Sequence, residues 1–118
     1  MNEYRFRVEF LEEAKEFLSE QDEKSRDKIL YNIWKARSIN DKELFKKLID
    51  EIWEFRTKYN GMYYRLFAFW DKGDNADAVV ISTHGLIKKT DKTPKSEIEH
   101  AENLRQKYFN DKIKKRKK

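Results

Sequence analysis

Two arginines, Arg56 and Arg65, are spaced in the sequence so that they could bind one anion together. The dipeptide Asn60-Gly61 between them is the strongest short signal for a β-hairpin. If these two residues form the turn, Arg56 lies directly opposite Arg65 across the hairpin. Like charges that face each other on a sheet repel, and a phosphate between them would relieve the repulsion, because planar guanidinium groups match phosphate oxygens.

The same spacing has a simpler interpretation. Both arginine side chains could extend into water, or one of them could pair with a nearby acid such as Glu54. Exposed arginines are common on sheets, and a slip of one residue in the register would separate the pair. The sequence alone leaves a phosphate site and a solvated or acid-paired arrangement both open.

Aromatic and basic side chains share the predicted face of the hairpin with the arginines. Lys58, Tyr63 and Phe67 all fall on this face in the same register. Aromatic rings among cations suit the stacking of nucleotide bases, which gives a candidate surface for single-stranded RNA. The alternative is that the rings are buried under the C-terminal helix.

A second group of possible catalytic residues, His84, Lys88 and Lys89, lies at the end of the last predicted strand and just beyond it. Histidine is the most usual proton-transfer residue near neutral pH. A lone histidine is more often structural, however, and Lys88-Lys89 alone would be a solvated pair of charges. Because the chain has two His and no Cys, we expect no metal site and no cofactor.

The spacing of apolar residues predicts the elements that hold these side chains. Alternation predicts strands, helical spacing predicts helices, and Asp22 and Thr93-Pro94 are typical of helix starts. The predicted order is a strand at 4–10, a helix at 11–20, a helix from Asp22 to near Ser38, a connection at 39–50, strands at 52–59, 62–70 and 78–84, and a helix from Thr93 to 109.

This order of elements is typical of an α+β domain, with the helices packed on one face of a small antiparallel sheet. We expect residues 1–109 to form one domain. The predicted core is made of apolar residues from every predicted element except the last helix: Phe6, Val8, Phe17, Leu30, Ile33, Trp53, Phe55, Leu66 and Ile81.

Charge is unevenly distributed along the 118 residues, whose net charge is +5. Residues 110–118 hold six basic residues and one acid, and we expect this tail to be disordered and to bind RNA nonspecifically. Residues 46–95 carry three more basic than acidic residues, so any anion site belongs there. The chain has no apolar run long enough to span a membrane. The absence of a secretory-type start and of Cys leads us to expect a cytoplasmic protein.

Taken in order, these segments resemble the HigB-type, often phage-derived branch of the RelE/ParE toxin superfamily over residues 4–109. The motifs that carry the resemblance are Leu48 with Ile52-Trp53-Glu54-Phe55-Arg56, Tyr64-Arg65, His84-Gly85 with Lys88-Lys89, and Thr93-Pro94 before the helix from Glu97 to Tyr108. The resemblance implies helices on a small antiparallel sheet. It also implies a type II toxin that inhibits translation by cleaving mRNA on the ribosome without a metal, held inactive by a helix-turn-helix, HigA-like antitoxin.

The resemblance further implies roles for individual residues. Arg56, Arg65, His84, Lys88 and Lys89 correspond to catalytic positions. The arginines would stabilise charge on a phosphate attacked by the neighbouring 2′-hydroxyl group, and His84 or a lysine would move protons. The resemblance also implies RNA contacts for three further residues, Lys46, Lys47 and Tyr108.

The sequence departs from the pattern of the branch in two places. Leu86 occupies a position where the branch usually has Phe, and the basic tail is not part of the pattern. The superfamily also contains gyrase inhibitors and inactive proteins. The alternative function is therefore a binding protein without nuclease activity, either a ParE-like gyrase inhibitor or a relic that binds only its antitoxin.

Overall fold

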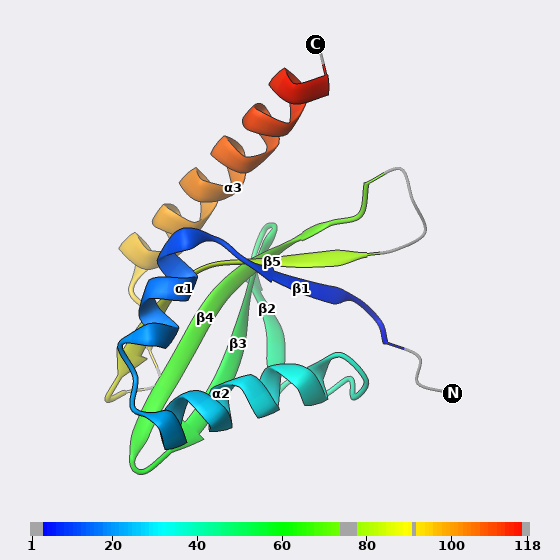
Figure 1. Cartoon of the computed structure of the whole chain (residues 1–118). Helices are drawn as coiled ribbons and strands as arrows, with labels where there is room; N and C mark the ends of the chain where they lie inside the picture. The colour runs from blue at the N-terminus through cyan, green and yellow to red at the C-terminus, as the bar shows by residue number, and fades with distance from the viewer. Residues whose placement is uncertain (1–3, 74–77, 91, 117–118) are drawn as a thin grey trace.

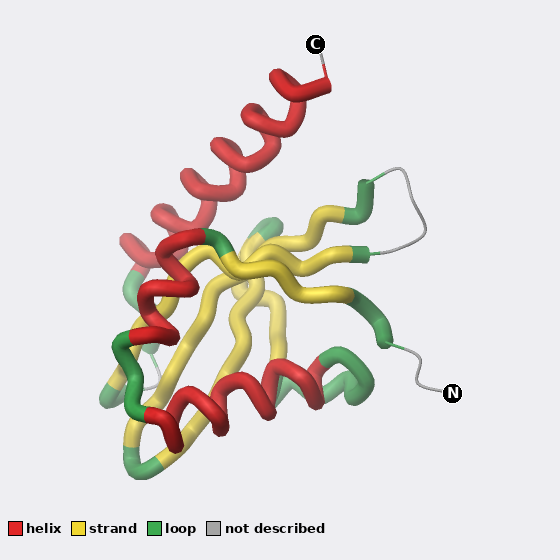
Figure 2. The backbone as a smooth tube through the Cα atoms, viewed as in Figure 1, coloured by secondary structure: helices red, strands yellow, loops and turns green. Residues whose placement is uncertain are grey.

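A five-stranded sheet runs through the protein and is flanked by three helices. The computed structural model describes residues 4–73, 78–90 and 92–116. In chain order the elements are β1 (Arg7–Phe10), α1 (Glu12–Ser19), α2 (Glu23–Ala36), β2 (Phe45–Ile49), β3 (Ile52–Tyr59), β4 (Met62–Asp71), β5 (Val79–Lys88) and α3 (Lys95–Arg116). The strand order is β1-β5-β4-β3-β2, and the strands fan apart in Figure 2 as in a twisted sheet. The predicted α+β class is confirmed.

The helices cover both faces of the sheet. Phe17 of α1 and Ile33 of α2 belong to one buried apolar cluster, and α2 crosses the front of the sheet in Figure 1. Ala101 of α3 belongs to a second cluster with Ile52 and Phe67 of the strands. The prediction that all helices pack on one face is therefore wrong for α3. Ile52 and Phe67 give the second face an apolar surface of its own, which binds a helix.

The sheet is mixed rather than purely antiparallel. The pairs β2–β3, β3–β4 and β4–β5 are antiparallel, as predicted for the last three strands. β1 instead pairs parallel with β5, from Arg7 opposite Val79 to Phe10 opposite Ser82. The alternation of residues 4–10 predicts a strand but carries no information about its direction or its neighbour.

The hairpin between β3 and β4 has the predicted register. Asn60 and Gly61 form the turn with φ values of 53° and 76°, the left-handed conformation that this type of two-residue turn requires. Arg56 consequently lies opposite Arg65. β5 continues to Lys88, four residues beyond the predicted end, so Lys88 belongs to the strand.

The stretch predicted as a connection, 39–50, contains strand β2. A two-residue turn at Asp50 and Glu51 joins β2 to β3, with Ile49 opposite Ile52. Asp50 adopts a φ of 51°, which aspartate tolerates better than most residues. The sequence signal was weak because the turn has no glycine. Phe45 belongs to the first apolar cluster, Leu48 packs against the second and Ile49 is exposed, so β2 lacks the alternation of a half-buried strand.

The terminal helix is longer than predicted. α3 continues to Arg116, so residues 110–116 are helical instead of disordered, and 117–118 lie outside the described residues. Lys112 Nζ donates a hydrogen bond to Asp71 Oδ2 at 2.6 Å, and this ion pair joins the last turns of the helix to the end of β4. No helix within the described ranges is long and apolar enough to cross a membrane.

Most of the predicted core is buried. Six of the nine residues are buried, and Val8 and Trp53 are partly buried and pack against the core. The prediction for Leu30 is wrong, because 38% of this residue is exposed. α2 turns a partly polar face to the sheet, including Asn32, whose Nδ2 donates to Thr57 Oγ1 at 3.1 Å. Because these polar residues are buried, the apolar residues alone do not show which face of α2 packs on the sheet.

Gly85 lets α1 pack closely on β5. A Cβ atom at this position would lie 2.3 Å from the nearest atoms of the Phe17 ring, much closer than a van der Waals contact. The residue after His84 must therefore be glycine, because the backbone and an aromatic ring approach each other there.

We expect Gly85→Ala to lower the free energy of unfolding by about 1–3 kcal/mol, because the added methyl group overpacks the core. Urea denaturation measures the change. Phe17→Leu makes room for the methyl group, so the double variant should be more stable than the sum of the single losses predicts. Strictly additive losses would contradict this contact.

Candidate anion-binding site

Glu54, Arg56 and Arg65 form a buried cluster of charges on the face of the sheet that also carries α3. Glu54 and Arg56 are two residues apart on β3 and share this face, and Arg65 lies opposite on β4. Glu54 Oε2 is 3.5 Å from Arg56 Nε, and Glu54 Oε1 is 3.5 Å from Arg65 Nε. The exposed fraction is 14% for the Arg56 side chain and 2% for those of Arg65 and Glu54. The opposed pair therefore exists, and the acid lies between its two members.

Backbone carbonyl groups also hold the two arginines. Arg65 Nη1 donates to the Tyr64 carbonyl at 3.2 Å, and Arg56 Nη1 donates to the Lys42 carbonyl at 3.4 Å. Each guanidinium group thus has an ion-pair contact at Nε, without a hydrogen bond there, and a hydrogen bond to a backbone carbonyl from one terminal nitrogen. Such fixed donors suit the recognition of one anion in a defined place.

A small hollow opens beside the cluster. It has a volume of about 80 Å³, and Arg56, Lys58, Tyr63 and Arg65 contribute to its walls. Lys58 Nζ and Arg65 Cζ lie 5.3 and 5.6 Å from the centre of the Tyr63 ring, so the ring makes cation–π contacts with both. A water molecule occupies about 30 Å³ in the liquid, and the hollow therefore has room for one phosphate-sized group.

Two further lysines lie on the same face as the arginines. Lys88 of β5 is paired with Tyr63 and is buried, with Nζ donating to Thr93 Oγ1 at 2.9 Å. Lys46 of β2 is paired with Glu54 and is half-buried. Both extend the positive charge of the cluster to the neighbouring strands.

Lys47 and Lys89 do not join this group. Lys47 is paired with Trp53, and alternation along the strand places it on the opposite face from Glu54. Lys89 follows the end of β5 and is exposed. The sequence interpretation treated each adjacent pair of lysines as one unit, but neighbours along a strand point to opposite faces.

His84 is buried under α3 and both of its ring nitrogens are engaged. Nε2 lies 3.0 Å from Glu97 Oε2, Nδ1 lies 3.0 Å from Thr83 Oγ1, and the ring stacks on Phe67 at 4.8 Å. Burial lowers the pKa of His84 and outweighs the opposite effect of Glu97, so the ring is neutral at pH 7. Its Nε2–H then donates to Glu97. His84 thereby joins β5 to the first turns of α3 instead of facing the hollow.

Phe67 and Tyr108 are also placed differently from the RNA-contact prediction. Phe67 is fully buried against α3, as the alternative interpretation of the sequence allowed. The Tyr108 hydroxyl donates to Asp71 Oδ2 at 2.7 Å. Asp71 lies six residues beyond Arg65 on β4, roughly 20 Å along the strand, so Tyr108 is remote from the cluster.

Sequence reasoning missed some of the residues that organise this face. Glu54 was named as a possible partner of the arginines, because it shares the face of Arg56 two residues along the same strand. Glu97 gave no local signal as a partner of His84, since 13 residues separate them. Their contact depends on where α3 packs.

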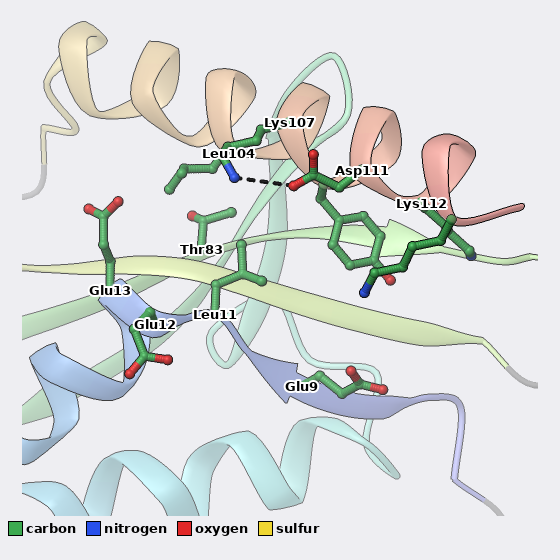
Figure 3. A pocket seen from close by; sticks show the side chains of 11 residues that line it. Glu9, Leu11, Glu12, Glu13, Thr83, Leu104, Lys107, Asp111 and Lys112 are labelled. Carbon is green, nitrogen blue, oxygen red and sulfur yellow. Dashed lines mark hydrogen bonds and ion pairs between the residues drawn. The ribbon is translucent and has the colours of Figure 1, made fainter. Parts of the chain in front are cut away.

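A larger cavity lies between α3 and the segment that joins β1 to α1, with a volume of about 620 Å³. Glu9, Glu12 and Glu13 lie on one side of it, and Lys107 and Lys112 of α3 lie on the other (Figure 3). Neither arginine of the charged cluster lines it. The cavity is therefore a separate feature in which opposite charges face each other between α3 and the first strand and helix.

The described ranges contain no group of three or more His, Cys, Asp or Glu side chains arranged to hold a metal ion. The expectation of a reaction without a metal remains a prediction. The donors at the hollow are guanidinium, ammonium and phenol groups, and one acid, Glu43, also contributes to its wall. This set of donors suits an anion.

The fold and the charged cluster define a small α+β protein with an opposed arginine pair beside a phosphate-sized hollow. Residues 16–106 match the model of the phage-derived Gp49-like protein family (DUF891), and the chain belongs to this family. The family is toxin-like and of the RelE/HigB type, which confirms the coarser part of the resemblance. A search of curated proteins finds no match.

The contacts of Asp71 give a prediction for the pH dependence of stability. Burial raises the pKa of Asp71, but hydrogen bonds from Lys112 and Tyr108 outweigh this effect and hold the pKa below the usual 3.8. A carboxyl group with a depressed pKa stabilises the folded state above the unfolded pKa. This stabilisation is lost as the pH falls through the folded value.

We therefore expect Asp71→Asn to lower the free energy of unfolding by about 1–3 kcal/mol at pH 7, because hydrogen bonds to a charged group are lost. The difference from the wild type should persist down to about pH 5 and shrink below about pH 4. Guanidinium chloride denaturation from pH 7 to pH 3 measures it. A difference that is independent of pH would show that the charge of Asp71 is not what stabilises α3.

Proposed function

We propose that this protein is the toxin of a type II toxin-antitoxin system of the HigB type and that it cleaves mRNA on the ribosome, thereby inhibiting translation. The observation that supports the proposal is the opposed pair Arg56 and Arg65 beside a hollow of phosphate size. The toxin-like family to which the chain belongs supports it independently.

In the proposed reaction, the oxygen of a ribose 2′-hydroxyl group attacks the adjacent phosphorus and loses its proton to a base. The bond from phosphorus to the 5′-oxygen of the next nucleotide breaks, that oxygen takes up a proton, and the products are a 2′,3′-cyclic phosphate and a 5′-hydroxyl end. Arg56 and Arg65 stabilise the negative charge that develops on the phosphoryl oxygens, as preorganised donors do. Lys88 lies on the same face and adds positive charge, and Tyr63 offers a ring for stacking a base. The ribosome holds the mRNA in line for attack, which lowers the barrier by positioning.

The contacts of His84 bear on proton transfer in this reaction. Its ring nitrogens are engaged by Glu97 and Thr83 in the structure. Arg65 is paired with Leu86 and Tyr63 with Lys88, so Lys88 lies two residues along β5 from the position opposite Arg65. Neither Lys88 nor His84 lines the hollow, but Lys88 is paired with Tyr63, which does, so of these two residues Lys88 is the better candidate for proton transfer.

One observation favours the alternative function, a binding protein without nuclease activity. Arg65 is nearly inaccessible, and the Nε atoms of both arginines face Glu54, which is the arrangement expected of a structural ion-pair network. A gyrase inhibitor or an inactive antitoxin-binding protein would need no more than this. Cleavage measurements distinguish the two functions.

We expect Arg56→Ala and Arg65→Ala each to reduce ribosome-dependent mRNA cleavage by about 10²- to 10³-fold, because each removes a charged donor from the transition state. Purified ribosomes programmed with a labelled mRNA provide the measurement. Arg7→Ala is the matched control, since Arg7 is exposed on β1 and pairs with Glu9. Wild-type cleavage by the double variant would exclude the arginines from the reaction.

The proposed partner is a small helix-turn-helix antitoxin encoded by a neighbouring gene. An active nuclease of this kind stops translation in its own host, so the host needs an inhibitor that binds the toxin. Co-expression of the adjacent gene should restore growth of cells that express this protein, and the two products should purify together. Continued growth arrest with both proteins present would argue against that gene as the antitoxin.

A further inference from the structure

Glu54 makes nearly symmetric contacts with the two arginines. Its two carboxylate oxygens lie at the same distance, 3.5 Å, from the Nε atoms of Arg56 and Arg65. Charge-assisted hydrogen bonds are shorter, about 2.7–2.9 Å, so both contacts are ion pairs without a hydrogen bond at Nε. One carboxylate is thus shared between two guanidinium groups.

This sharing solves a problem that the register creates. Arg56 and Arg65 are directly opposed and both are largely buried, so their repulsion is weakly screened. The negative charge of Glu54 offsets the repulsion, because each of its two oxygens forms an ion pair with one of the guanidinium groups. Without it, the repulsion would act against the hydrogen bonds that the two arginines donate to backbone carbonyls.

We infer that Glu54 is a positioning residue that holds Arg56 and Arg65 side by side as a single phosphate-binding pair. The inference rests on the proposed function in that the bound anion is taken to be the phosphate of an RNA. Glu54 itself does not touch the phosphate in this arrangement. It sets the spacing and orientation of the donors that do.

Charge and geometry predict opposite effects of Glu54→Gln, which makes the inference testable. The substitution removes a negative charge from the cluster, so electrostatics alone predicts tighter binding of any anion. A glutamine, however, has one acceptor oxygen and one donor NH2 group, and the NH2 group would face an arginine donor. If Glu54 positions the pair, the substitution weakens binding although the site becomes more positive.

The experiment titrates inorganic phosphate into the isolated protein and follows the Nε–H resonances of Arg56 and Arg65 by NMR. In the wild type both resonances should shift together with one dissociation constant. Glu54→Gln should weaken phosphate binding roughly 10- to 100-fold, the range expected for misplaced groups. Asp71→Asn is the matched control, because Asp71 is also buried and bound by a lysine but lies at the far end of β4. It should leave phosphate binding unchanged.

Glu54→Asp is the second variant, because it keeps the charge and shortens the side chain by one methylene group. It should weaken phosphate binding less than Glu54→Gln does. Binding by Glu54→Gln that equals or exceeds that of the wild type would overturn the inference. If neither variant folds, the wild-type titration decides, since a shift of one arginine alone, or of neither, also overturns it.

Cleavage on the ribosome separates this inference from the proposed function. If the wild type cleaves, Glu54→Gln should lower kcat more than it changes KM, because the added positive charge still attracts RNA. If the wild type does not cleave but phosphate binding depends on Glu54, the nuclease proposal fails and the positioning role is retained. Loss of stability in Glu54→Gln with unchanged phosphate binding and unchanged cleavage would show a merely structural role.

Discussion

One carboxylate, that of Glu54, contacts two arginines on the sheet face that also carries α3. Burying one guanidinium group is unfavourable unless a charge and hydrogen bonds compensate for the lost water, and two opposed groups add their mutual repulsion. The cluster remains in place because Glu54 contacts both arginines and backbone carbonyls bind their terminal nitrogens. Arg56 and Arg65 form part of the wall of the hollow, so its shape depends on where these contacts place the two guanidinium groups.

The position of α3 determines which part of this face is open. The helix covers Phe67 and Phe69 of β4, and its first turns are fixed to β5 through Glu97 and His84. Arg65 lies on β4 before the covered stretch. The same face thus has an apolar part sealed by the helix and a cationic part beyond the start of the helix. Burial of His84 belongs to the first part and the anion site to the second.

Local patterns predicted the hairpin and its register, because Asn60-Gly61 determines the turn and the turn determines every pair of β3 and β4. The opposition of the two arginines therefore follows from the sequence. The face that α3 covers, the parallel pairing of β1 and the partner of His84 do not follow from it, since each depends on segments far apart in the chain. β2 was missed for another reason. Its apolar residues pack in both apolar clusters or are exposed, so the alternation that marks a half-buried strand is absent.

The parallel pairing of β1 with β5 also determines the order in which the strands of the sheet can pair during folding. Arg7 is paired with Val79, which is 72 residues later in the chain, whereas β3 and β4 are joined by a two-residue turn. Contacts between distant residues form late, because the entropy of closing a long loop must be overcome first. At a synthesis rate of about 5–20 residues per second, the first strand waits roughly 4–14 s for its partner. The hairpin that carries both arginines ends at Asp71, before β5 begins, and can therefore form before the edge strand closes the sheet.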